Sequence, residues 1–198
     1  MLDDNIGESR NLARSLMFLR YREDKTTQAA ARLLQAKGGR MSYMSLIKLL
    51  YFADRRAFAE LGRPISSDLF VSMPHGPVLS RTLDLVTAEP ERVESYWRRY
   101  ISEPEHYEVR LLDEVPNDQL SPAEEHIVDD VFHEFGHLTR WELVDRSHKL
   151  PEWKDPHGSS IPIEPRVILM AQGIPEDDVD AILEELAADE AVEALADS

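Results

Sequence analysis

Hydrophobic residues recur along most of the chain with the period of an amphipathic helix, but one stretch is apolar on nearly every side. Between Tyr43 and Ala53 the only charged residue is Lys48. A helix without a broad polar face buries apolar side chains in any orientation, so we predict that this segment is a central, buried helix. Ser42 precedes it, and serine is a favoured N-cap residue because its side-chain oxygen accepts a hydrogen bond from the first helical turn.

Amphipathic patterns on both sides of this segment predict shorter helices that pack around it. Apolar residues with helical spacing occur in 26–37, 78–87, 122–135, 139–148, 167–171 and beyond Pro175. The third of these segments starts within a capping box, Ser121-Pro-Ala-Glu124, which places proline at the first helical position. In the fourth, the apolar set is Trp141, Leu143 and Val144. Residues 9–21 fit either a short amphipathic helix or a flexible leader.

Two segments have the character of strands. Leu69–Met73 is short and apolar, and His106–Leu112 alternates apolar and polar residues. We expect these two segments to pair in a small sheet of two or three strands. The proline-rich segment Leu150–Pro165 is predicted to be an ordered loop that Trp153 anchors. The predicted fold class is therefore α+β, mainly α with a small β-sheet, with the helices packed around the buried central helix.

The length of 198 residues suits a single domain with tails. We expect an N-terminal extension over 1–25, the main domain over 26–173, and an acidic C-terminal helix or tail over 174–198. The last segment supplies most of the net charge of −16, because 175–198 holds ten acidic residues and no Lys or Arg. An acidic balance disfavours non-specific binding to nucleic acid, which relies on basic patches. We therefore expect no nucleic-acid partner.

The composition also restricts chemistry and location. The chain has no cysteine, which excludes thiol chemistry and thiolate metal sites and fits a reducing compartment. No apolar run approaches the 18 or so residues of a membrane-spanning helix. The first residues, Met1-Leu-Asp-Asp-Asn5, lack the basic and apolar regions of a signal peptide. We expect a cytoplasmic protein with no membrane contact.

One motif matches a known catalytic pattern. His133-Glu134-x-x-His137 has the H-E-x-x-H spacing of zinc peptidases, in which two histidines on one helix face bind the metal and the glutamate acts as base. Glu142, Asp145 or His148 would be candidates for a third ligand. A zinc-dependent hydrolase is therefore the alternative function, with His133 and His137 as metal ligands.

The helix pattern argues against that alternative. The apolar residues of the same helix define a face that lies nearly opposite His133 and His137, so both histidines are predicted to face solvent. Gly136, which lies within the motif, also suggests that the helix ends there. We therefore expect two exposed histidines, no metal and no cofactor.

Three further groups of polar residues have a structural and a functional interpretation each. His75-Gly76-Pro77 sets either a tight turn into a helix or a binding surface made by His75 and the free amides of the helix start. Asp54, Arg55 and Arg56 are predicted to join an internal ion-pair network, with Asp68 or Asp84 as partners.

The third group is Ser147-His148, followed by Trp153. Adjacent residues rarely place a serine hydroxyl on the neighbouring imidazole, and no G-x-S-x-G motif is present. We therefore predict no catalytic residues in this group or elsewhere in the chain.

Several of these segments together resemble a known family. They are Gly39–Arg55, Gly62-Arg-Pro-Ile65, Met73-Pro-His-Gly-Pro-Val-Leu-Ser80, Leu120-Ser-Pro-Ala-Glu124 and Ser147-His-Lys-Leu-Pro-Glu-Trp153. In order and spacing they resemble the SocA-like antitoxins, also called the Panacea domain, over about 26–173. Many members of that family are associated with phages, prophages or plasmids.

The resemblance implies a mostly helical domain and a non-enzymatic antitoxin that neutralises a cognate toxin by direct binding. The founding member delivers its toxin to the ClpXP protease, so a role as a proteolytic adaptor is also implied. A third possibility, separate from the resemblance, is a phage-encoded adaptor that hands a host protein to a protease, with the acidic C-terminal helix as its docking piece. The family pairs with many unrelated toxins, so the toxin itself is not implied. The residues that we expect at the family-specific partner-binding surface are Asp54, Arg55, His75, Gly76, Pro77, Ser147, His148 and Trp153.

Overall fold

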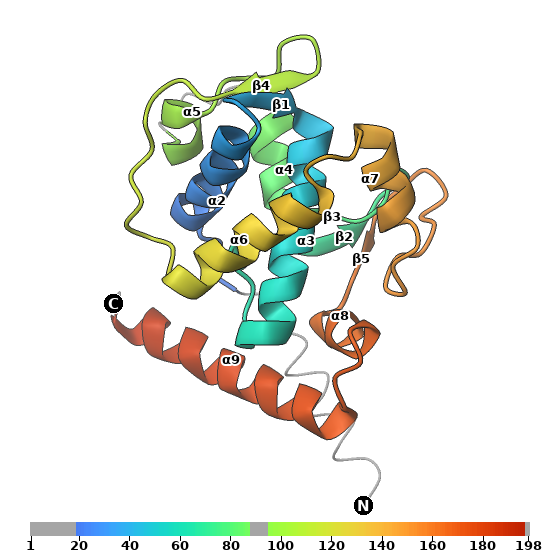
Figure 1. Ribbon diagram of the computed structural model, residues 1–198. Helices are drawn as coiled ribbons and strands as arrows, with labels where there is room; N and C mark the ends of the chain where they lie inside the picture. Colours follow the sequence, from blue (N-terminus) through green and yellow to red (C-terminus); the bar gives the residue numbers. More distant parts are fainter. Residues whose placement is uncertain (1–18, 88–94, 197–198) are drawn as a thin grey trace, which may run out of the picture.

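The computed structural model describes residues 19–87 and 95–196, which form eight helices and five short strands (Figure 1). The helices are α2 (Glu23–Ala36), α3 (Tyr43–Leu61), α4 (Ser80–Thr87), α5 (Tyr96–Tyr100), α6 (Pro122–Phe135), α7 (Arg140–Ser147), α8 (Pro165–Ala171) and α9 (Glu176–Ala196). The strands are β1 (Arg40–Ser42), β2 (Phe70–Ser72), β3 (Val78–Leu79), β4 (Glu108–Arg110) and β5 (Ile161–Pro162). The predicted class, mainly α with a small β component, is confirmed.

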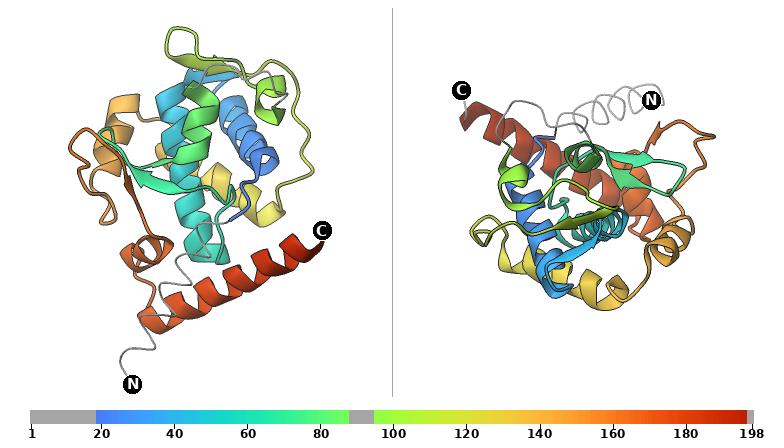
Figure 2. Two further views of the ribbon diagram at one scale, coloured as in Figure 1. Left: turned by 180° about the vertical axis from the view of Figure 1, so that it is seen from behind. Right: turned by 90° about the horizontal axis from the view of Figure 1, so that it is seen from above.

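Helix α3 is the centre of the fold. It contacts α2, α4, α6, α7 and α8, and the view from above shows it near the middle of the molecule (Figure 2). Every residue from Leu46 to Asp54 is buried, as the near absence of charge predicts. Gly62 ends the helix with a φ of +73°, in the left-handed conformation that glycine adopts without strain.

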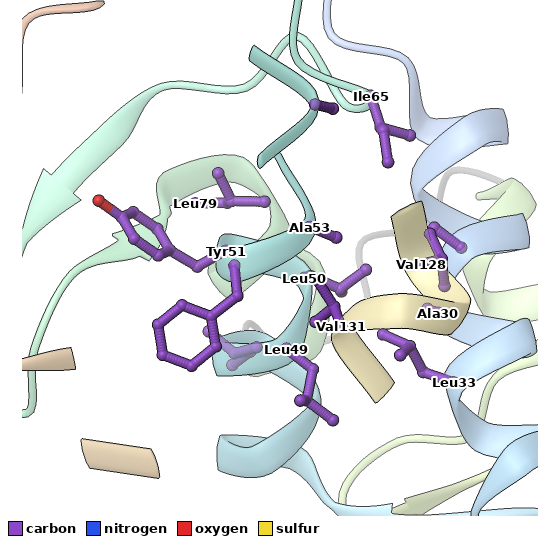
Figure 3. Close-up of a cluster of buried hydrophobic side chains, with 14 of the residues drawn as sticks. Ala30, Leu33, Leu49, Leu50, Tyr51, Ala53, Ile65, Leu79, Val128 and Val131 are labelled. Carbon is purple, nitrogen blue, oxygen red and sulfur yellow. The ribbon is translucent and has the colours of Figure 1, made fainter. Parts of the chain in front are cut away.

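Three helices contribute the largest part of the core. Figure 3 shows Ala30 and Leu33 of α2, Leu50 of α3, and Val128 and Val131 of α6 meeting in one cluster, and all five are buried. Burial of a Leu or Val side chain contributes about 1.5–3 kcal/mol, so this layer supplies a large share of the stability. The predicted capping box at the start of α6 is confirmed.

The five strands form two separate antiparallel sheets. One pairs β1 with β4, and the other has the order β3-β2-β5. The predicted pairing of β2 with β4 is therefore wrong. Gly38 and Gly39, both with a φ of +91°, turn the chain so that β1 lies along β4, with Met41 opposite Val109. The turn after Ser72 returns the chain along β2 as β3.

One predicted capping hydrogen bond and one predicted helix start differ from the structure. Ser42 occupies the N-cap position of α3, but its side chain makes no capping hydrogen bond. The amide of Tyr43 donates instead to the carbonyl of Tyr107 at 3.0 Å. Helix α4 begins at Ser80, not at Val78, because the two preceding residues pair with β2.

The C-terminal helix packs across one end of the molecule (Figure 1). Its predicted apolar stripe is confirmed, since Val179, Leu183 and Leu186 are buried and Ile182 lies near Gly62 at the end of α3. Among the described residues, no helix combines the length and apolar character needed to cross a membrane. The predicted segment 9–21 lies almost wholly outside the described residues.

Candidate partner-binding surface

The His-Gly-Pro motif forms a tight turn between β2 and β3. The amide of Gly76 donates to the carbonyl of Met73 at 3.0 Å, and Gly76 has a φ of +87°. A residue with a Cβ atom adopts this left-handed region at a cost of about 1–2 kcal/mol. Pro74 and His75 are exposed, whereas Gly76 and Pro77 are buried. The turn therefore presents only its first two residues at the surface.

The buried half of the turn rests on Lys48 of α3 and Ser147 of α7. The Lys48 ammonium donates to the Pro77 carbonyl at 2.7 Å, and the Ser147 hydroxyl donates to the Val144 carbonyl at 2.8 Å. A Cβ atom on Gly76 would collide with Ser147 Oγ and lie 2.9 Å from Lys48 Nζ, so only glycine fits. Burial disfavours the charged ammonium and lowers the pKa of Lys48 to about 7.

The loop after α7 closes over the other side of the turn. Trp153 Nε1 donates to the Met73 carbonyl at 3.1 Å, and His148 Nε2 lies 3.2 Å from the Pro74 carbonyl. Because a carbonyl only accepts, Nε2 of His148 carries the proton. The His148 and Trp153 rings pack with their centroids 4.2 Å apart. We call the following five residues the turn lock: Lys48, Gly76, Ser147, His148 and Trp153.

A buried ion pair fastens this loop to α3. Arg55 Nε donates to Glu152 Oε1 at 2.5 Å, and the Tyr51 hydroxyl donates to the same oxygen at 3.1 Å. The Glu152 side chain has no exposed surface, so water does not compete for these contacts. The predicted ion-pair partners of Arg55, Asp68 or Asp84, are wrong, because the loop brings in a carboxylate from 97 positions away.

Asp54 points away from this site. It accepts hydrogen bonds from the amide of Ser66 at 3.0 Å and from the Ser66 hydroxyl. Burial raises the pKa of Asp54 to about 7. Asp68 accepts from the amides of Arg81 and Thr82, at 3.0 and 2.8 Å, in the first turn of α4. These amides are therefore engaged, and the interpretation that free helix amides form a binding surface is wrong.

Exposed aromatic side chains lie beside the tip of the turn. Trp141 is 52% exposed and Tyr107 is 67% exposed. The Arg140 guanidinium lies 5.2 Å from the Trp141 ring centroid and 5.8 Å from the Tyr107 ring centroid. The His75 ring lies 6.1 Å from Trp141. We call these four residues, His75, Tyr107, Arg140 and Trp141, the aromatic rim.

The place of Trp141 corrects the sequence pattern, which grouped it with Leu143 and Val144. Those two residues are buried, but Trp141 lies about 200° around the helix from Leu143 and faces outward. Trp, Tyr and Arg are the residue types that dominate binding energy at protein interfaces. The aromatic rim therefore has the composition of a contact surface.

The comparison with protein families places the turn lock and the aromatic rim in one family domain. The family model described as Antitoxin SocA-like, Panacea domain, matches residues 46–154, which is more than half of the chain. The chain belongs to the SocA-like antitoxin family. The searches of curated proteins and of solved structures gave no match. The matched span runs from the first turn of α3 to Lys154, so it contains the turn lock, the Arg55–Glu152 pair and the whole aromatic rim.

The H-E-x-x-H motif of this SocA-like antitoxin lies on the surface. His133 and His137 are exposed, and α6 ends at Phe135, inside the motif. The glutamate, Glu134, forms an ion pair with Arg56 of α3. Within 19–87 and 95–196, no group of three or more His, Asp or Glu side chains is placed to hold a metal ion. The motif is therefore not assembled into a metal site in the described structure.

The eight residues expected at the partner-binding surface fall into three burial classes. Buried residues include Asp54 together with Gly76, Pro77 and Ser147, whereas Arg55, His148 and Trp153 are partly buried and His75 is exposed. Most of them therefore shape the fold around the turn, and only His75 belongs to the aromatic rim. Sequence reasoning missed Tyr107 and Arg140, and the signal for Trp141 was its position opposite the apolar face of a short helix.

Proposed function

We propose that this protein is an antitoxin that neutralises a cognate toxin by direct protein–protein binding, with the aromatic rim as the main contact surface. The observation that carries the proposal is the exposed Tyr107–Arg140–Trp141 cluster inside the span that matches the family. Large exposed aromatic side chains that hold an arginine between them are typical of binding hot spots.

The turn lock supports this proposal because it makes the neighbouring surface rigid. The buried hydrogen bond from Lys48 and the partly buried one from Trp153 fix the turn whose tip carries His75. A contact surface that is ordered before binding loses less conformational entropy when the partner docks. The protein would therefore bind its toxin without refolding the turn.

Membership of an antitoxin family favours a non-catalytic role, and the chemistry of the site agrees with it. Two charged groups of the interior, Lys48 and Glu152, donate or accept hydrogen bonds within the protein and are shielded from solvent. Groups that are enclosed in this way hold the fold and do not reach a substrate. We further propose that 26–173 form the antitoxin domain, that 1–25 and 174–198 flank it, and that the protein acts in the cytoplasm.

A refinement of the same function is that the protein delivers its toxin to a protease such as ClpXP. The exposed apolar residues Val192 and Leu195 near the acidic end of α9 favour it, because a protease-docking segment needs accessible side chains. A stop codon after Ala187 keeps the three buried residues of α9 and removes this end. If the refinement holds, the shortened protein still binds the toxin but no longer accelerates its degradation, and unchanged degradation contradicts it.

The test of the main proposal uses the product of the neighbouring open reading frame as the toxin. We expect that product to arrest growth when expressed alone, and co-expression of this protein to restore growth and to give a complex that co-purifies. Trp141→Ala and Tyr107→Ala should abolish rescue without lowering the melting temperature. Met170→Ala, at an exposed residue of α8 outside the rim, is the matched control and should leave rescue intact.

One result would contradict the antitoxin function, and another would contradict only the aromatic rim as the contact surface. A neighbouring product that is harmless and does not co-purify removes the antitoxin function. Rescue that survives both rim substitutions leaves the antitoxin function in place but moves the contact surface elsewhere.

A further inference from the structure

A pocket of about 390 Å³ opens next to the aromatic rim and shares Arg140 with it. One wall is formed by β1 and the start of α3, and the other by the connection between α6 and α7. Its lining includes four basic or imidazole side chains, Lys37, Arg40, His137 and Arg140, together with the hydroxyl residue Ser42. We call this the cationic pocket.

The charge of the pocket is opposite to that of the whole chain. The chain carries a net charge of −16, but the one acidic residue of the pocket lining is Glu108. Glu108 Oε2 lies 4.0 Å from Arg40 Nε, and the Arg40 side chain is 74% exposed, so this contact neutralises the guanidinium only weakly. In the described part of the chain, no carboxylate forms an ion pair with Arg140, whose guanidinium lies against the rings of Tyr107 and Trp141.

The start of α3 adds a partial positive charge and two hydroxyl groups to the same wall. Helix α3 starts at this pocket, and the N-terminus of a helix carries a partial positive charge. Its N-cap residue, Ser42, makes no capping hydrogen bond, and Ser42 Oγ is buried with no hydrogen-bond partner among the described residues. Ser45, in the first turn of α3, also lines the pocket.

We propose that the cationic pocket receives a carboxylate side chain, Asp or Glu, from an acidic segment of the toxin. This inference rests on the proposed function and names the chemistry of the partner. The carboxylate enters between Arg40 and Arg140, and an adjacent apolar residue of the same segment lies on Trp141. Arginine on both sides suits a carboxylate, because the guanidinium presents paired donors that match its two oxygens.

The first test measures toxin affinity for charge-reversal variants. Arg40→Glu should weaken binding at least tenfold and reduce the dependence of the association rate on salt. Arg99→Glu, at an exposed arginine of α5 that does not line the pocket, is the matched control and should change affinity less than twofold. Changing the docking carboxylate of the toxin to Lys should restore binding to Arg40→Glu. Equal affinity of Arg40→Glu and the unaltered protein overturns the pocket assignment and leaves the antitoxin function standing.

The second test does not need the toxin, so it remains decisive if the antitoxin function itself fails. A hexaglutamate peptide is titrated into the isotope-labelled full-length protein and followed by amide NMR spectra. We expect shifts at Arg40, Ser42 and His137 that disappear in Arg40→Glu and persist in Arg99→Glu. Absent shifts, or shifts produced by an oligonucleotide and not by the peptide, contradict an acidic protein segment as the occupant.

Discussion

The turn lock and the aromatic rim are neighbours and both contain a tryptophan and a basic side chain. These side chains differ in burial and in the contacts that they make. Trp153 of the turn lock is partly buried and donates to the Met73 carbonyl at 3.1 Å, whereas Trp141 of the rim is exposed and rests against Arg140. Lys48 of the lock is buried, whereas Arg140 of the rim is partly exposed. Most motif residues behind the family resemblance therefore build a support, and their neighbours form the surface that we propose for partner contact.

The largest effect that separates the two regions concerns the ion pair behind the lock. Glu152→Ala leaves the Arg55 guanidinium partly buried without its carboxylate, which should lower the free energy of unfolding by about 3–5 kcal/mol. The matched control is Glu134→Ala, because Glu134 pairs with Arg56 in a setting where 47% of its side chain is exposed. Exposed pairs contribute at most about 1 kcal/mol. Urea denaturation measures both, and equal losses would show that Glu152 has no special role.

The next effect concerns the glycine of the turn. Gly76→Ala places a Cβ atom against Ser147 Oγ in addition to imposing a positive φ, so we expect a loss of about 2–4 kcal/mol. Gly158 has nearly the same φ, +88°, but nothing lies within 4 Å of its missing Cβ atom. Gly158→Ala should therefore cost only about 1–2 kcal/mol. If the two substitutions cost the same, the turn is not held as tightly as the contacts indicate.

The sequence predicted an element correctly where a long pattern of apolar and polar residues, or a complete capping motif, was compatible with one structure only. The central helix followed from the near absence of charge between Tyr43 and Ala53, and the start of α6 from its capping box. The strands are two or three residues long, too short for their alternation to select a partner. Their pairing depends instead on turns, such as the one at Gly38 and Gly39, and the sequence pattern did not reveal it.

The candidate site was less predictable because its residues come from distant parts of the chain. Arg55 and Glu152 are 97 positions apart, so charge pattern alone offered several equally good partners. Tyr107 immediately precedes β4 and Arg140 begins α7. No local sequence pattern links these two residues. Helix α7 has eight residues, about two turns, which is too little for periodicity to show that Trp141 points outward.

A smaller effect for each pH unit should appear as a pH dependence of stability from Lys48 and Asp54, two of the buried titratable groups. The pKa of Lys48 falls from 10.5 to about 7 on folding, so between pH 7 and pH 10.5 the unfolded chain binds more protons. Stability therefore rises with pH in this window, by up to about 1.4 kcal/mol per pH unit. Lys48→Met should remove this rise. Thermal unfolding at several pH values measures it, and an unchanged profile in the variant would mean that Lys48 does not titrate there.

Asp54 should give the opposite slope at lower pH. Its pKa rises from 3.8 to about 7 on folding, so between these values the folded protein binds more protons. Its contribution to stability is present at low pH and is lost as the pH rises toward 7. Asp54→Asn should reduce this slope, of which a share remains because burial also raises the pKa of Asp68. It should leave the slope above pH 7, which belongs to Lys48. A loss of both slopes in one variant would show that the two groups are coupled.

The smallest effect compares the same substitution in the two tryptophans. Trp153→Phe removes the donor to the Met73 carbonyl and should cost about 1 kcal/mol, whereas Trp141→Phe should change stability by less than about 0.5 kcal/mol. Acrylamide quenching provides an independent readout, because the chain has three tryptophans and Trp97 is fully buried. Trp141→Phe should remove most of the quenchable fluorescence. Strong quenching that survives this substitution would place Trp153 in solvent and show that the loop of the turn lock opens.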